Sequence, residues 1–186
     1  MKKTDFYRRA RTDIPGPLSG LRVLEATTTW AGPMCAAVLA DFGADVIKVE
    51  IPTGDISRAV APNLPGTEVS VMHTTVNRNK RALSLDVRTE KGRDIFLKLA
   101  TSSDVMVENF KVGTMAGYGL GYDQLCAVKP DIVYVSITGW GQFGPNHEAA
   151  AYDPLAQAAS GFMSVTGSSD GPPTKAGTYL ADDLGG

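Results

Sequence analysis

The sequence contains few residues of the types that bind metals or form disulfides. Its 186 residues include two cysteines, Cys35 and Cys126, and two histidines, His73 and His147. Two cysteines so far apart do not suggest a disulfide framework or a zinc site, so we expect buried thiols in a reducing compartment. Neither histidine has a carboxylate or a cysteine at the spacing of metal ligands, and we expect no metal in the active site.

The sequence also lacks an excess of charge of either sign and any long apolar run. Lysine and arginine number 18 and aspartate and glutamate 20, which leaves no basic excess to hold a nucleic-acid backbone. No apolar run approaches the ~20 residues that span a bilayer, and the basic N-terminus is not followed by the apolar stretch of a secretory signal. We therefore expect a cytoplasmic protein with no nucleic-acid partner and no membrane contact.

Two common phosphate-binding motifs are missing. The sequence contains no G-x-x-x-x-G-K-[ST], and no G-x-G-x-x-G follows the first predicted strand. Each motif brings glycine backbone close to a nucleotide phosphate. Neither a P-loop nor a typical dinucleotide site is expected.

The sequence does contain a regular alternation of strand and helix patterns. From Leu18 onward, short β-branched runs alternate with helical segments, which is typical of βαβ units. This pattern predicts an α/β fold with a Rossmann-like, mostly parallel sheet flanked by helices. The predicted strands are residues 21–24, 45–49, 82–87, 104–108 and 132–137, and the longer helices after the first are residues 89–100, 122–129 and 153–162.

The first predicted helix has clear start and stop signals. Pro33 lies in its first turn, where a missing N–H removes no hydrogen bond, and Gly43 ends it. Met34, Val38 and Phe42 are spaced to form one apolar face. Residues 50–79 lack such periodicity and predict a long loop that could include one short helix.

No internal domain boundary stands out. We divide the chain into a basic arm, residues 1–16, and a single α/β unit, residues 17–186. The sequence ends on Gly185 and Gly186, where an α/β fold would normally open a new helix. We therefore expect a fragment, or a protein completed by another chain.

Two of the loops after predicted strands could bind anionic groups, because ligands of open α/β sheets bind at the carboxyl ends of strands. Residues 27–33 could offer free N–H groups at the start of a helix to an anionic or thioester oxygen. Residues 77–81, with Arg88, could hold phosphates. A capping loop and a solvated charge run are the ordinary alternatives.

Two further loops could contact a ring or an acyl group. Residues 107–111 include Asn109, which could bond a ring edge, and Phe110, which could stack on it. A satisfied asparagine and a core phenylalanine explain the same residues equally well. Residues 136–145 form a glycine-rich loop that could come close to a ligand. The ordinary alternative is a tight turn that packs over the sheet edge.

Near the C-terminus, Asp182 lies between an apolar, strand-like stretch and two glycines that leave room for a bulky acyl group. A carboxylate at this position can cap a helix. It can also be a nucleophile that needs no base, because it is already ionised at neutral pH. The local sequence leaves both interpretations open.

These segments occur in a fixed order along the chain. They are PLSGLRVL (17–24), AGP (31–33), FGADVIKVE (42–50), NKR (79–81), VENF (107–110), TGWGQ (138–142), YD (152–153) and LAD (180–182). Together they resemble the N-terminal part of the family III CoA-transferases, also called the CaiB/BaiF family. That family includes formyl-CoA:oxalate and carnitine CoA-transferases and the related α-methylacyl-CoA racemases.

The resemblance implies that Asp182 is the catalytic carboxylate, which carries first the acyl group as a mixed anhydride and then CoA as a thioester. It implies that CoA is bound as a substrate, with an acyl-CoA donor and a carboxylic acid acceptor. The implied CoA-binding residues are Trp30, Ala31, Leu85, Arg88, Asn109, Phe110, Lys111 and Tyr152. It further implies an incomplete large domain of an interlocked-dimer fold, as a homodimer or a heteromer with a related subunit.

The sequence departs from the family pattern at three positions where members place a cation. These are Ile51, Gly117 and Ala150. CoA would then be bound by Arg88, Lys111 and the basic residues 78–81 instead.

Two alternatives stay open. One is an α-methylacyl-CoA racemase, although Tyr152 stands where racemases carry a histidine. The other is a non-catalytic CoA-binding subunit of a heteromer.

Overall fold

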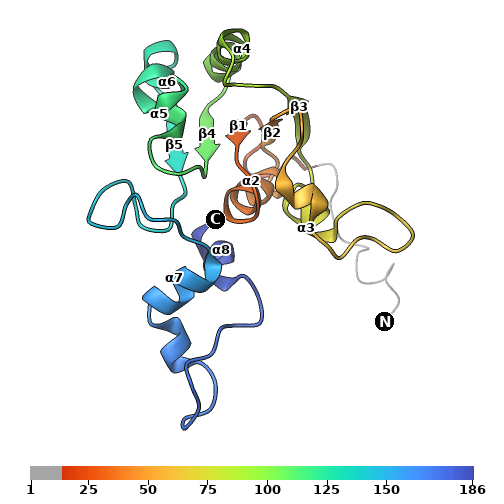
Figure 1. Cartoon of the computed structure of the whole chain (residues 1–186). Helices are drawn as coiled ribbons and strands as arrows, with labels where there is room; N and C mark the ends of the chain where they lie inside the picture. Colours follow the sequence, from red (N-terminus) through yellow and green to blue (C-terminus); the bar gives the residue numbers. More distant parts are fainter. Residues whose placement is uncertain (1–13) are drawn as a thin grey trace.

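The computed structural model describes residues 14–186. Apart from its last three residues, the basic arm predicted for residues 1–16 lies outside the described part of the chain. Within the described part, no helix is both long enough and apolar enough to cross a bilayer. Figure 1 follows the chain through its elements.

The centre of the fold is a five-stranded parallel sheet, as predicted. Its strands are β1 (Arg22–Ala26), β2 (Asp45–Glu50), β3 (Arg81–Ser84), β4 (Val105–Glu108) and β5 (Val133–Ser136), in the order β3-β2-β1-β4-β5. The chain builds outward from β1 to β3 and then crosses to β4, so the direction of building reverses between β1 and β4. Open α/β sheets bind ligands at the carboxyl ends of strands beside such a reversal.

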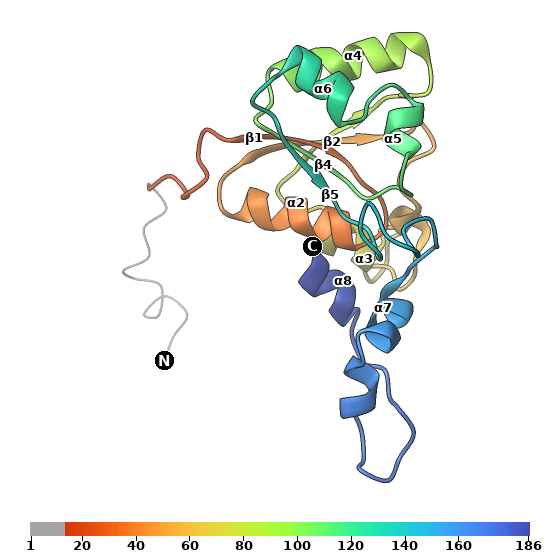
Figure 2. The ribbon, with the colours of Figure 1, turned by 90° about the vertical axis from the view of Figure 1, so that its left-hand side faces the viewer.

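Helices cover both faces of the sheet (Figure 2). One face carries α2 (Ala31–Asp41), and the other carries α4 (Glu90–Thr101) and α6 (Tyr122–Val128), with the short α5 (Thr114–Gly117) beside α6. Because alternate residues of a strand point to opposite faces, each strand contributes to two apolar clusters.

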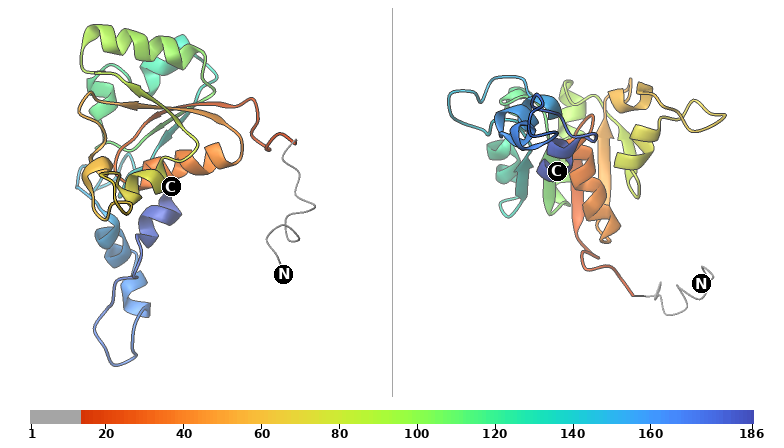
Figure 3. Two further views of the ribbon diagram at one scale, coloured as in Figure 1. Left: turned by 90° about the vertical axis from the view of Figure 1, so that its right-hand side faces the viewer. Right: turned by 90° about the horizontal axis from the view of Figure 1, so that it is seen from below.

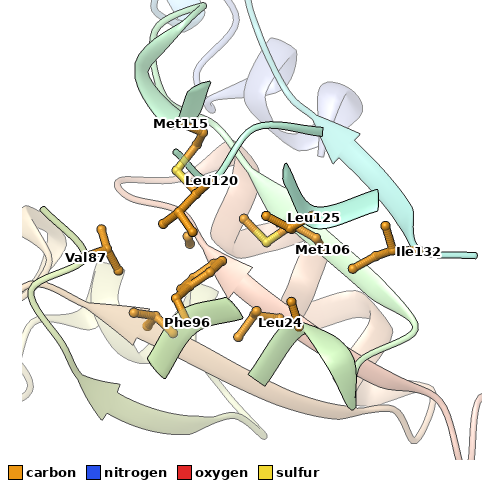
Figure 4. Close-up of a cluster of buried hydrophobic side chains, with 11 residues drawn as sticks. Leu24, Val87, Phe96, Met106, Met115, Leu120, Leu125 and Ile132 are labelled. Atoms are coloured by element: carbon orange, nitrogen blue, oxygen red, sulfur yellow. The ribbon is translucent and has the colours of Figure 1, made fainter. Parts of the chain in front are cut away.

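The larger apolar cluster lies between the sheet and α4 with α6. Phe96 of α4 is fully buried in it among Leu24, Met106, Leu120 and Leu125, each with an exposed fraction of 0% (Figure 4). The smaller cluster faces α2. These two clusters make the region from β1 to β5 a closed apolar core.

The apolar face predicted for the first helix is wrong. Val38 and Phe42 are 39% and 51% exposed, whereas Ala36, Ala37 and Ala40 are buried. Small residues let α2 approach closely: a Cβ atom added to Gly32 would lie 2.6 Å from Thr27 Cγ2. The helix ends as predicted: Gly43, with a φ of 100°, follows its C-cap Phe42.

The segment between β2 and β3 contains two short helices where one at most was expected. They are η1 (Ile56–Ala59), which Asp55 caps, and α3 (Val71–Val76), which Ser70 caps. Helices of four and six residues are too short to produce a periodic pattern. Their capping residues are the only signal of them in the sequence.

Both edge strands are shorter than predicted. An edge strand pairs on one side only and stops where its neighbour stops. The last paired residues are Ser84, opposite Glu50, and Ser136, opposite Glu108.

The C-terminal part adds three short helices at the carboxyl edge of the sheet. These are α7 (Asp153–Ala159), η2 (Phe162–Val165) and α8 (Leu180–Gly185). The predicted helix 153–162 ends earlier because Gly161 has a φ of 79°. Figure 3 shows that the loop between η2 and α8 projects away from the sheet, while α8 returns to the start of α2.

Candidate functional site

Asp182 lies at the carboxyl edge of the sheet, in the first turn of α8. The N-cap of this helix is Tyr179, so the interpretation of Asp182 as a helix cap is wrong. Leu180 and Ala181, expected to be strand-like, are the first residues of the helix. Asp182 is half-buried, and nothing within residues 14–186 donates a hydrogen bond to its carboxylate.

Trp30 connects α8 to the loop after β1. Its Nε1 donates to Oδ1 of Asp183 at 2.6 Å, and its ring packs on that of Tyr179 with 4.9 Å between the centroids. At the other end of α8, a Cβ atom added to Gly186 would lie 2.1 Å from the carbonyl oxygen of Ala31. The predicted residues Trp30, Ala31 and Asp182 are therefore brought together.

Asp153, the first residue of α7, holds α8 from the opposite side. It is 2% exposed, and its Oδ1 accepts a hydrogen bond from Ala181 N at 2.8 Å. Its Oδ2 accepts from Nε2 of Gln157 at 2.7 Å, and Gln157 Oε1 in turn accepts from Ala176 N. The sequence interpretation did not assign Asp153 a role in the site, although an acid in the first turn of a helix beside Tyr152 was visible.

The electrostatic environment of Asp182 is negative. Burial, together with the charges of Asp153 and Asp183, raises the pKa of Asp182 to about 6. Desolvation and like charge both disfavour the ionised form. Asp182 is thus mainly ionised at neutral pH but holds its charge less firmly than an ordinary aspartate.

The loop between β1 and α2 is held by Asn109. Oδ1 of Asn109 accepts from Thr28 N and its Nδ2 donates to Thr28 O, both at 2.8 Å. These two bonds use the amide that was expected to meet a ring edge. The structure therefore favours the satisfied-asparagine interpretation and makes Asn109 a support of the loop.

Most of the cations predicted to hold phosphates already have carboxylate partners. Arg78 pairs with Asp41, Arg81 with Asp45 and Arg88 with Asp86, all at the surface. Lys80 is enclosed, with a side-chain exposed fraction of 2%, and pairs with Glu25. The prediction of a continuous basic run for phosphates is wrong for Lys80, because its ammonium group does not reach solvent.

A second group of predicted residues lies at the carboxyl ends of β3 and β4. Leu85 and Phe110 both pack against the larger apolar cluster and are only partly buried. Lys111 lines a pocket of about 450 Å³ whose other walls include Glu108, Met115, Tyr122, Tyr134 and Ser136. Burial raises the pKa of Glu108 in this pocket.

The remaining positions that the family resemblance singled out are exposed to solvent or have free space around them. Tyr152, directly before α7, is 70% exposed, and Ile51, directly after β2, is 42% exposed. A side chain at Gly117 would meet nothing within 4 Å.

Within residues 14–186, no three histidine, cysteine or acidic side chains lie close enough together to hold a metal ion. Cys35 and Cys126 are both free. Neither is fully buried, so the expectation of two buried thiols is wrong.

Comparison with known proteins finds relatives of the chain among CoA-transferases. The model of "CoA-transferase family III" matches residues 18–186. The chain is 46% identical to a succinate–glutarate CoA-transferase of Agrobacterium fabrum, over 92% of this chain and 45% of that protein. It is 44% identical to a formyl-CoA:oxalate CoA-transferase of Streptomyces avermitilis, over 89% of this chain and 40% of that protein.

A solved structure shares the fold. The crystal structure of a CaiB/BaiF family protein from Brucella suis matches with a TM-score of 0.87 and 42% identity, over 92% of this chain and 47% of that one. The chain thus spans a little under half the length of the relatives that it matches.

Proposed function

Because the chain belongs to CoA-transferase family III, we propose that it carries the nucleophile of an enzyme that moves CoA between an acyl-CoA thioester and a carboxylic acid. The observation that carries this proposal is the environment of Asp182. Its carboxylate is half-buried and has no hydrogen-bond donor among residues 14–186, and its helix, α8, contacts α2. A poorly solvated carboxylate is a better nucleophile than one bonded to several donors.

The proposed reaction proceeds through two covalent forms of Asp182. An oxygen of its carboxylate attacks the thioester carbonyl of the donor, the C–S bond breaks, and CoA leaves as a thiolate, which gives a mixed anhydride. The thiolate then attacks the Asp182 carbonyl of that anhydride and releases the donor acid. Asp182 now carries CoA as a thioester.

The second half reverses these steps with another acid. The acceptor carboxylate attacks the aspartyl thioester and releases CoA thiolate, and the thiolate attacks the acceptor carbonyl of the new anhydride. Acceptor-CoA forms and the Asp182 carboxylate is restored. No proton, ATP or electron is consumed, because a carboxylate and a thiolate are comparable leaving groups on an acyl carbon.

The start of α2 could stabilise the negative charge that develops on the oxygen of the attacked carbonyl. Neither Ala31 N nor Gly32 N has a hydrogen-bond partner within residues 14–186. Backbone N–H groups at a helix start are suited to an oxyanion. We assign Ala31 and Trp30 to the thioester end of CoA on this basis.

We assign the nucleotide end of CoA to the carboxyl ends of β3 and β4. The pocket of about 450 Å³ supports the β4 side of this placement, because Lys111 lines it together with Glu108 of β4 and Ser136 of β5. Leu85 and Phe110 pack against one apolar cluster, which links the residues after β3 to those after β4, and Arg88 follows Leu85 in the sequence. Asn109 supports the site indirectly, through its hydrogen bonds to Thr28. Tyr152 is an exposed residue directly before α7.

A transfer assay tests the proposal. In the protein that contains this chain, Asp182→Asn should lower the rate of CoA transfer from succinyl-CoA to glutarate by at least about 10³-fold, since the nucleophile is lost. Asp170→Asn, the same change in an exposed loop, should leave the rate within twofold of the wild type. Equal rates for Asp182→Asn and the wild type would support a non-catalytic CoA-binding subunit instead.

A second measurement separates transferase from racemase. A racemase exchanges the α-proton of a 2-methylacyl-CoA into deuterated water without moving CoA. Tyr152 disfavours this activity, because a phenol is a weaker base at neutral pH than the histidine of racemases. We expect CoA transfer with no α-deuterium in the product.

We further propose that the active protein is a homodimer or a heteromer with a related subunit in the cytoplasm. Phe143, Val165 and Leu184 support an assembly, because their side chains are 86%, 82% and 78% exposed. A large apolar side chain is stabilised when a second surface covers it. Sedimentation of the purified protein should show at least two subunits.

A further inference from the structure

Four charged side chains are buried together beneath the loop that joins β1 to α2. They are Glu25, Lys48, Asp55 and Lys80, which we call the Glu25 cluster, and none of these side chains is more than 2% exposed. They alternate in sign. Lys48 Nζ lies 3.0 Å from Asp55 Oδ2 and 3.1 Å from Glu25 Oε1, and Lys80 Nζ lies 2.8 Å from Glu25 Oε2.

The positive members of the cluster bind carbonyl groups at both ends of the loop. Lys48 Nζ donates to Thr27 O at 3.0 Å, where the loop leaves β1. Lys80 Nζ donates to Pro33 O at 2.7 Å, in the first turn of α2, and to Asn77 Oδ1. The two lysines therefore fix the points where the loop begins and ends.

Asp55 fixes the middle of the loop. Its Oδ1 accepts from Thr29 N and from Thr28 Oγ1, both at 3.2 Å, and from Ser57 N at 2.9 Å. Thr29 has a φ of 73°, a conformation that a β-branched residue rarely adopts and that requires support from its surroundings. Asp55 and Asn109 supply that support from opposite sides.

Stability alone does not explain the cluster. Removing four charges from water is expensive, and well-packed apolar residues of similar size often give an equal or greater free energy of unfolding. A buried network in which the charges are paired instead specifies one arrangement of the backbone that it binds. Here that backbone is the segment 27–33, and Trp30 lies at its centre.

We propose that Glu25, Lys48, Asp55 and Lys80 are positioning residues, which set the place of Trp30 and through it the place of α8 and Asp182. Trp30 transmits the effect because its indole N–H bonds Asp183, the neighbour of Asp182. The inference rests on the proposed function only for the role of Asp182, because the placement of Trp30 can be measured without a substrate.

Trp30 itself reports on the test. Trp30 and Trp140 are the only tryptophans among these 186 residues. Trp140→Phe therefore leaves Trp30 as their single tryptophan, whose emission is excited at wavelengths that tyrosine does not absorb. In that background, Asp55→Ala should shift the emission of Trp30 to longer wavelength and at least double its quenching by acrylamide. Asp55→Asn, which keeps an oxygen for Thr28 and Thr29, should restore most of the wild-type signal.

A matched control separates positioning from a general loss of stability. Leu125→Ala empties part of the apolar cluster on the far face of the sheet and should leave the emission of the folded protein unchanged. An equal shift from Leu125→Ala, or no shift from Asp55→Ala, would overturn the inference. If circular dichroism shows that Asp55→Ala does not fold, Thr28→Val decides. It removes the hydroxyl that donates to Asp55 Oδ1 at 3.2 Å and lies 3.5 Å from Thr29 Oγ1, and it should give a smaller shift in the same direction.

Kinetics in the protein that contains this chain give the second measurement. Asp55→Ala should lower kcat about tenfold and change KM for the acyl-CoA less than twofold, because a misplaced Asp182 affects the chemical step and not CoA binding, and Asp55→Asn should recover most of the lost kcat. A change in KM alone would contradict a positioning role. If Trp30 moves as expected but Asp182→Asn retains full activity, only the proposed function fails.

Discussion

Two regions of this molecule are held together in opposite ways. From β1 to β5, the large buried side chains are mostly apolar and form closed clusters on both faces of the sheet. From residue 140 to residue 186, the buried residues are Asp153 and Gln157, while Phe143, Val165 and Leu184 are largely exposed. The region that carries Asp182 therefore depends on polar anchors rather than on an apolar core.

The difference indicates where the molecule can move. Regions with few buried apolar contacts open with a lower free energy than the core of the same protein. The proposed reaction passes a bulky CoA group in and out, and it would need such an opening near Asp182. The polar anchors, Asp153 on one side and Trp30 on the other, give α8 a defined position without tying it into the core.

The largest effect on stability is expected from a substitution in the apolar region. Phe96→Ala should lower the free energy of unfolding by about 3–5 kcal/mol, because it empties a fully buried site in the larger cluster. Phe143→Ala, the same change at an 86% exposed side chain, should change it by less than about 0.5 kcal/mol. Urea denaturation measures both. Similar losses for the two variants would contradict the division into two regions.

A smaller effect should stay within the C-terminal region. Asp153→Ala removes the acceptor for Ala181 N and Gln157 Nε2, which should cost about 1–3 kcal/mol of local stability. Hydrogen exchange should then speed up about tenfold or more at the amides of α8 and leave those of β1 and β4 unchanged. Leu155→Ala, a half-exposed position on the same helix, is the control and should leave the α8 amides protected. Faster exchange throughout the sheet would show that the regions are coupled.

The smallest expected effect concerns the charge of Asp182. Its pKa is raised to about 6 from an unfolded value of 3.8, so the folded state binds the proton more tightly and becomes less stable as pH rises through about 6. Asp182→Asn removes this penalty and should raise Tm at pH 7 by roughly 3 °C, a discounted value because the half-exposed group is screened by solvent.

The pH dependence checks the cause of that gain. At pH 4, where the folded wild type is already protonated at Asp182, the gain in Tm should largely vanish. Thermal melting of the wild type and of Asp182→Asn at both pH values measures it. A gain of the same size at both values would mean that the substitution stabilises α8 by something other than charge.

The sequence predicted the apolar region better than the site. β-branched runs and start and stop signals such as Pro33 and Gly43 located the strands of the sheet and its order of elements, because burial imposes a periodic pattern. The apolar face predicted from Val38 and Phe42 was wrong, because close packing of α2 on the sheet selects alanine and leaves the larger side chains exposed.

The site depends on contacts between residues far apart in the sequence, which no local pattern encodes. The bonds from Trp30 to Asp183 and from Asp153 to Ala181 join residues 153 and 28 positions apart. Asp182 was predicted from the order of the family motifs, while its environment followed from the structure. Lys80 shows the reverse case, since a residue that looks solvated in a charge run is buried.

The most direct measurement is the chemical state of Asp182 during turnover. The protein that contains this chain is incubated with succinyl-CoA and then with hydroxylamine, which converts an aspartyl anhydride or thioester to a hydroxamate, and the peptide carrying Asp182 is analysed by mass spectrometry. We predict the hydroxamate on Asp182, none on the adjacent Asp183, and none in Asp182→Asn. Transfer of CoA with an unmodified Asp182, or with the hydroxamate on another residue, would contradict the proposed mechanism.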